Sequence, residues 1–297
     1  MCLAEHGRRY LIGITDSAPI LNDRLLLEGF TPFVSGDITK RTDPSRVFPY
    51  AQSIVVVCAP YGGGKFYSNL SSLGVCDDYH KKVKAILQAK AAELAEAFAS
   101  FKHKILVDSP TLCERSLAAR AGLCFFGKNG LCFSPEFGSR FNIGLMLTNI
   151  PVQAIEIICR AWAKPAAGRA SQAPAENASA CEHDCNLCIK ACPNRALAEG
   201  KPLNANLCIS YLTQKKELSA DEEKLLHGQL YGCDICQSIC PKNAKHAAHH
   251  LNPMHVLKLS DEELAEKFGH TAMNWKLDLL RRNAKLCALY KSRGFSH

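Results

Sequence analysis

The sequence predicts an α+β protein with a mixed α/β first part, a small cysteine-rich module and a short helical C-terminus. A continuous apolar run at 54–58 (IVVVC) is typical of a buried strand. An amphipathic pattern over residues 79–101 indicates a long helix that covers a sheet. Eight of the sixteen cysteines lie within the sixty residues from Cys181 to Cys240, at metal-ligand spacing.

The elements follow one another in an order that predicts separate parts of the chain. A short strand is predicted at 105–107 and a helix at 112–121, and two further helices are predicted at 261–268 and 275–290. Residues 160–180 are dominated by Ala, Pro, Ser, Gly and Asn without a hydrophobic period. We therefore predict four parts: an α/β domain at 1–160, a linker or exposed loop at 161–180, the cysteine module at 181–245 and a helical tail at 246–297.

Composition indicates a soluble globular protein. Apolar residues make up 47% of the chain, yet no stretch approaches the ~18 consecutive apolar residues of a membrane span. The first residues lack the pattern of a signal peptide, so we expect a cytoplasmic protein without a membrane partner. A net charge of +8 favours a polyanionic partner. The basic excess after Lys276 fits a nucleic-acid surface and a solvated helix face equally well.

The cysteines repeat a run that binds iron–sulfur clusters. Each run has the spacing C-x2-C-x3-C-P, with one cysteine before the first run and one between the two. Because the last cysteine of each run reaches the other cluster, two [4Fe-4S] clusters are predicted. The first would be held by Cys181, Cys185, Cys188 and Cys240, and the second by Cys192, Cys208, Cys233 and Cys236.

Two alternatives accompany this interpretation. A pair of zinc knuckles would also use cysteines at short spacing, but the two Cys-Pro endings and the eight cysteines favour clusters. Cys181 and Cys185 are separated by one residue more than usual, so His183 is an alternative to Cys181 as ligand. The module is expected to be ferredoxin-like and to pass single electrons from a soluble donor to another redox site.

Several motifs, in the same order along most of the chain, resemble the epoxyqueuosine reductase family. They include Asp78-Tyr79-His80, Asp108-Ser109-Pro110, Gly127-Lys128-Asn129, Pro135-Glu136-Phe137-Gly138-Ser139, Cys208-Ile209-Ser210-Tyr211-Leu212-Thr213 and Gly232-Cys233-Asp234-Ile235-Cys236-Gln237. The resemblance implies a nitroreductase-like, cobalamin-binding first domain and reduction of epoxyqueuosine to queuosine in tRNA. The expected partners are the anticodon region of tRNA and a low-potential donor such as ferredoxin or flavodoxin, and we expect a monomer.

The resemblance also implies roles for individual residues. Asp108 would be the proton donor, at a corner where a carboxyl can be partly desolvated and its pKa raised. An ordinary helix N-cap is the alternative interpretation of this Asp-Ser-Pro corner. Lys216 would touch tRNA. The residues expected near cobalamin are Arg41, Asp108, Lys128, Asn129, Cys132, Pro135, Ser210 and Asp234.

Other functions remain open at this point. The same cofactors could serve a corrinoid and iron–sulfur reductase with another substrate, as in reductive dehalogenases. A ferredoxin-like electron carrier, whose first domain only docks a partner, is the alternative from another class. Cobalamin uptake distinguishes the carrier from the two enzymes.

Overall fold

The computed structural model describes residues 10–21, 33, 36–62, 65–159, 162 and 181–292. The predicted linker at 161–180 lies outside these residues, except for Trp162. The chain forms two compact units that do not divide it at a single point. The first consists of Met1–Pro60 and His80–Asp184, and the second of Tyr61–Tyr79 and Cys185–His297.

The first unit is built on an antiparallel sheet with strand order β1-β2-β7-β4. Its strands are β1 (Leu11–Asp16), β2 (Ser53–Pro60), β4 (His103–Val107) and β7 (Phe141–Thr148). A hairpin of β5 (Phe125–Phe126) and β6 (Cys132–Phe133) lies between β4 and β7 along the chain. The helical elements are α2 (Ile38–Thr42), η1 (Pro44–Arg46), α4 (Tyr79–Ala97), α5 (Glu114–Arg120) and α6 (Val152–Cys159).

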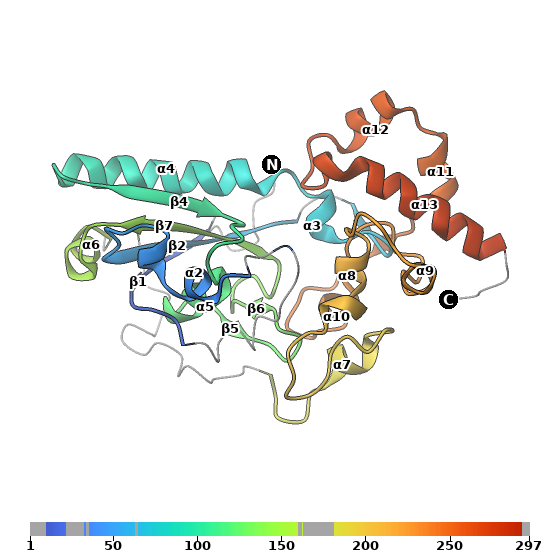
Figure 1. The fold of residues 1–297 in the computed structure, drawn as a ribbon, viewed down its shortest axis with the longest axis horizontal. Helices are drawn as coiled ribbons and strands as arrows, with labels where there is room; N and C mark the ends of the chain where they lie inside the picture. Colours follow the sequence, from blue (N-terminus) through green and yellow to red (C-terminus); the bar gives the residue numbers. More distant parts are fainter. Residues whose placement is uncertain are drawn as a thin grey trace. The chain divides into compact units, whose positions relative to one another are not determined.

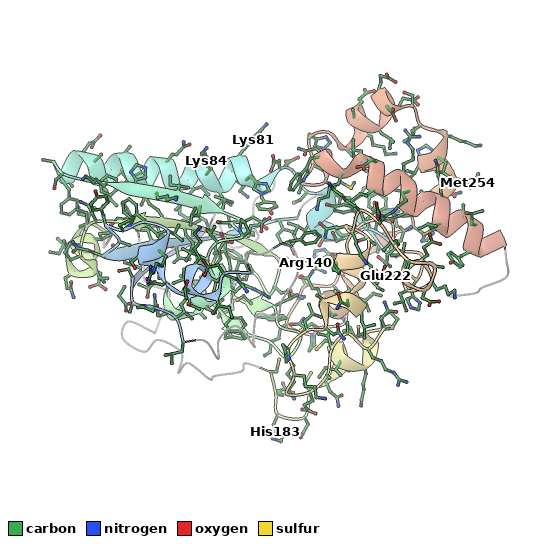
Figure 2. All side chains as sticks on the ribbon, in the orientation of Figure 1. Lys81, Lys84, Arg140, His183, Glu222 and Met254 are labelled. Carbon is green, nitrogen blue, oxygen red and sulfur yellow. The ribbon has the colours of Figure 1, made fainter. Side chains whose placement is uncertain are left out.

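The central strand β2 is buried on both faces, which explains its continuous apolar sequence. Ile54, Val56 and Cys58 pack in one core with α5, whereas Val55 and Val57 pack in a second core with α4. Figure 1 shows α4 along one face of the sheet. Figure 2 shows Lys81 and Lys84 on the side of α4 that faces away from the sheet. The predicted helix that covers a sheet is therefore confirmed.

The second unit is mainly helical. Strands β3 (Phe66–Tyr67) and β8 (Ala248–His249) form a short parallel pair. The helical elements are α3 (Ser72–Val75), α7 (Leu187–Ala191), η2 (Ala205–Leu207), α8 (Ile209–Leu212), α9 (Ala220–Lys224), α10 (Ile235–Ser238), α11 (Pro253–Lys258), α12 (Asp261–Phe268), η3 (Asn274–Lys276) and α13 (Leu277–Ser292). Helices α11, α12 and α13 pack around a core that includes Val256, Leu264, Leu280, Ala284 and Cys287.

The predicted elements agree with the structure apart from their ends. The helix predicted at 275–290 begins at Leu277, and Trp275 lies instead in the 3-10 turn η3. Ser260 and Glu263 form a capping box that starts α12 at Asp261. No helix in the described part of the chain is long and apolar enough to cross a membrane.

Candidate active site and iron–sulfur centres

Helices α7 and α10 carry the middle cysteine of each short run and contact each other. Cys188 lies in α7 and Cys236 in α10. The N-cap residues, Asn186 and Asp234, make no side-chain capping hydrogen bond. The first-turn N–H groups can therefore face sulfur, and the N–H of Ile235 does donate to the Cys233 thiol.

The four cysteines predicted for the second cluster lie close enough to influence one another electrostatically. Burial raises the pKa of Cys233 to about 12, and the nearby Cys208 and Cys192 contribute to the increase. Burial likewise raises the pKa of Cys236, with Cys233 and Cys208 as the next causes. These thiols lie close together and away from water. Such an arrangement suits an iron–sulfur cluster, because iron displaces the thiol protons and binds the thiolates.

Backbone N–H groups are directed at the same sulfurs. Cys208 accepts from the N–H groups of Tyr211 and Ser210 at the start of α8. Cys192 Sγ accepts from Ala196 N at 3.3 Å. These donors stabilise negative charge on sulfur, so the residues present fit a [4Fe-4S] cluster.

Cys181 belongs to the first unit, whereas the other seven predicted ligands belong to the second. Lys128 N donates to Cys181 Sγ at 3.4 Å, and Lys128 Nζ donates to His183 O at 2.7 Å. The His183 side chain is fully exposed, with Nδ1 3.0 Å from Asp184 Oδ1, and Figure 2 shows it at the outer end of this segment. This geometry favours Cys181 over His183 as a ligand.

Asp108 follows β4 directly and adopts a left-handed backbone conformation with φ of 50°. Such a conformation in a residue other than glycine is strained and needs support. Ser109 N donates to Glu114 Oε1 at 3.0 Å, and Ser109 Oγ accepts from Thr111 N at 3.2 Å. Helix α5 begins at Glu114 with Cys113 as its N-cap. Asp108 therefore caps no helix, and the alternative interpretation of this corner is wrong.

The Asp108 carboxyl lies near the imidazole of a histidine. Asp108 Oδ2 is 3.8 Å from His80 Nε2, and the side chain of Asp108 is 62% exposed. The described residues therefore do not provide the partial desolvation of the Asp108 carboxyl that the sequence led us to expect. His80 lies in a motif noted in the sequence but was not predicted as a site residue. Only the fold, which sets the start of α4 beside the end of β4, shows the pair.

The residues predicted near cobalamin in the first unit differ in their surroundings. Arg41 is 2% exposed at the end of α2, and its carbonyl accepts from Cys113 N at 3.1 Å. Asn129 is buried, its Oδ1 accepts from Leu131 N, and its Nδ2 donates no hydrogen bond to any residue in the described part of the chain. Cys132 is buried in the core that contains Cys58, whereas Pro135 is exposed in a turn.

In the second unit, Ser210 and Asp234 take part in the local hydrogen bonding. Ser210 O accepts from Gln214 Nε2 at 2.9 Å. Asp234 Oδ2 accepts from Ser72 N at 2.7 Å and from Ser72 Oγ, and Asp234 Oδ1 accepts from Gln237 Nε2 at 3.0 Å. The Asp234 carboxylate thus joins the second cysteine run to the start of α3.

Two basic residues near the C-terminus, both in α13, are bonded to other residues of the protein. Arg282 donates to the carbonyls of Lys216 (2.8 Å) and Thr213 (3.3 Å), and Arg281 pairs with Asp261 at 2.7 Å. These two arginines hold the fold together. Lys216 is exposed, and its contact with tRNA stays a prediction.

The grouped cysteines and the backbone N–H groups directed at their sulfurs indicate an iron–sulfur protein. The family model described as "4Fe-4S double cluster binding domain" matches residues 180–243, and clusters rather than zinc knuckles are therefore the finding. A second model, "Epoxyqueuosine reductase QueG, DUF1730", matches residues 41–109, a range that includes both Arg41 and Asp108.

Individual relatives extend the match over most of the chain. The epoxyqueuosine reductase of Listeria monocytogenes is 32% identical over 95% of this chain and 77% of its own length. The Bacillus subtilis enzyme is 33% identical over 93% and 74%, respectively. A crystal structure of an epoxyqueuosine reductase with an epoxyqueuosine-modified tRNA-Tyr stem loop has a TM-score of 0.74 and 30% identity, over 93% of this chain and 76% of that one. The chain belongs to the epoxyqueuosine reductase family.

Proposed function

We propose that this protein is an oxidoreductase that reduces epoxyqueuosine to queuosine in tRNA. The observation that carries the proposal is the Asp108 corner, which presents an exposed carboxyl on a strained and hydrogen-bonded turn within the segment that matches the family. Removal of an epoxide oxygen as water consumes two electrons and two protons. Clusters held by the cysteines would deliver the electrons, and Asp108 would donate a proton.

The cysteine module would deliver the electrons singly. The group of Cys192, Cys208, Cys233 and Cys236 would hold one cluster, and Cys181, Cys185, Cys188 and Cys240 the other. Each cluster carries one electron at a time, so two transfers complete the reaction. A low-potential protein such as ferredoxin or flavodoxin is the proposed donor.

Cobalamin is the proposed third cofactor, and one buried group of the first unit fits it. Asn129 Nδ2 is a buried amide donor that makes no hydrogen bond to the residues that the structure describes, and such a donor suits a ligand whose periphery is rich in amide oxygens. When bound, cobalamin would supply a strongly reducing metal centre for attack on the epoxide. Asn129 and Arg41 would help to hold it, with Lys128, Cys132 and Pro135 in or next to the same turns.

The residues around Asp108 have a separate task, the supply of a proton. Glu114 fixes the backbone of the turn through Ser109, and His80 lies within ion-pair distance of the carboxyl. A protonated Asp108 would act as general acid toward the epoxide oxygen. Ser210 and Asp234 remain predicted cofactor neighbours, although the Asp234 carboxylate already accepts three hydrogen bonds.

Turnover of an epoxyqueuosine-containing anticodon stem loop, with a low-potential reductant under anaerobic conditions, tests the proposal. The wild type should form queuosine, and Asp108→Asn should keep its cofactors and lose most activity, about 10²-fold or more. Asp16→Asn is the matched control, because Asp16 also ends a strand, is 59% exposed and pairs with a cation, Arg120, at 3.5 Å. Unchanged turnover in Asp108→Asn would remove that residue from the mechanism.

A further inference from the structure

Trp275 is an exposed aromatic residue whose ring is nevertheless held in place. Its side chain is 68% exposed in η3, between α12 and α13. The indole Nε1 donates to Ala272 O at 3.0 Å, so the polar atom of the ring is already used within the protein. What remains for a partner is the apolar ring face on the side away from Lys276.

Positive charge accompanies this ring. Lys276 Nζ lies 5.0 Å from the Trp275 ring centroid and donates to Gln214 Oε1 at 3.0 Å. The amide of Gln214 donates in turn to Ser210 O at 2.9 Å. Trp275 is thereby connected through its neighbour to the segment that carries Lys216, within the same unit.

The segment next to Gln214 contains one lysine that is ion-paired within the protein and one that is exposed. Lys215 Nζ binds both oxygens of Glu222 at 2.6 and 2.8 Å. This ion pair lowers the pKa of Glu222, which also caps α9. The next residue, Lys216, is exposed, and its carbonyl is held by Arg282. The Trp275 indole and the backbone of Lys216 are therefore both held by hydrogen bonds within the same unit.

We propose that Trp275 is a stacking platform for an unpaired base of RNA, with Lys216, in the same unit, as a phosphate contact. Proteins recognise single-stranded RNA by stacking its bases on exposed aromatic rings beside cations. The ring is fixed before binding, so little side-chain entropy is lost when a base stacks. The identity of the RNA rests on the proposed function, which supplies an anticodon loop with unpaired bases.

The affinity of a labelled anticodon stem loop, measured by fluorescence anisotropy over a range of salt concentrations, tests the platform. Trp275→Leu keeps an apolar side chain but removes the ring face, and it should weaken binding about 5- to 150-fold with an unchanged salt slope. Trp275→Phe should restore most of the affinity. Lys216→Met should instead reduce the salt slope by about 0.7 to 0.9, as expected for one lost phosphate contact.

Two controls separate stacking from other effects. A blunt RNA duplex without a loop should bind wild type and Trp275→Leu equally. The chain has two tryptophans, so Trp162→Phe leaves Trp275 as the only reporter, and its emission should be quenched by the stem loop. Equal stem-loop affinity of wild type and Trp275→Leu, or binding without quenching, would overturn the platform alone. Absence of stem-loop binding by the wild type would overturn the RNA substrate and the platform with it.

Discussion

Replacement of Asp234 by asparagine is the most informative perturbation of the cysteine module. The carboxylate lies between Cys233 and Cys236 in sequence, and its charge contributes to the raised pKa of both thiols. It also accepts two hydrogen bonds from Ser72 and one from Gln237. Asp234→Asn preserves the size of the side chain and removes its charge.

The cost in stability follows from these contacts. An asparagine oxygen can keep both donors of Ser72, but each hydrogen bond loses the assistance of a charge, worth about 1 kcal/mol. The amide nitrogen that replaces Oδ1 cannot accept from Gln237, so the variant should be at least about 2 kcal/mol less stable than the wild type. Its second cluster should also be easier to reduce, because an added electron no longer meets a neighbouring negative charge, and the reduction potential should become more positive.

A reductive titration followed by electron paramagnetic resonance measures this potential, and Ser72→Ala is the matched control. That control removes one hydrogen bond but keeps the carboxylate, so its cluster potential should stay unchanged or become more negative. A potential in Asp234→Asn that is unchanged or lower than that of the wild type would refute the reasoning. So would an equal positive shift in both variants.

Three further predictions test other parts of the structure. Gly144→Ala places a Cβ against Val83 and 2.9 Å from Leu87 Cδ1 and should cost about 1–3 kcal/mol of stability in chemical unfolding; no loss would contradict the packing of α4 on the sheet. Burial raises the pKa of Cys58 far above its usual value, so iodoacetamide at about pH 8 should label Cys58 only after unfolding. A further rise in pH should destabilise the fold, because the Cys58 thiol ionises at lower pH in the unfolded chain than in the folded protein. Labelling of the native protein would contradict this. Cys181→Ser should lower the iron content, whereas His183→Ala should not, and the opposite result would make the imidazole the ligand.

The sequence predicts those features that depend on local pattern. The apolar run of β2 and the period of α4 are set by burial on the sheet, and both were predicted. Strand β7 was missed, because Gly144 interrupts its apolar sequence and gives no strand signal. The structure gives the reason for that glycine, since α4 approaches β7 too closely for a side chain.

The candidate site likewise combines features that the local sequence pattern predicts with features that only the fold reveals. Cysteine spacing is local, so the double-cluster domain could be predicted from it, whereas the division of the eight cysteines between the two clusters stays a prediction. The contact of Lys128 with Cys181 joins residues 53 apart in sequence, and the pair of His80 and Asp108 joins two elements that only the fold brings together. The exposure of Trp275 was also not visible, because a tryptophan at the start of an amphipathic helix is usually buried.

The central claim is that this chain removes the epoxide oxygen from a modified base in RNA, with electrons that pass through its clusters. Mass spectrometry of nucleosides from an epoxyqueuosine stem loop, after anaerobic incubation with protein reconstituted with iron, sulfide and cobalamin, tests it directly. The account predicts queuosine, formed only when reductant, clusters and cobalamin are all present. Unconverted epoxyqueuosine, with both cofactors confirmed in the protein, would contradict it.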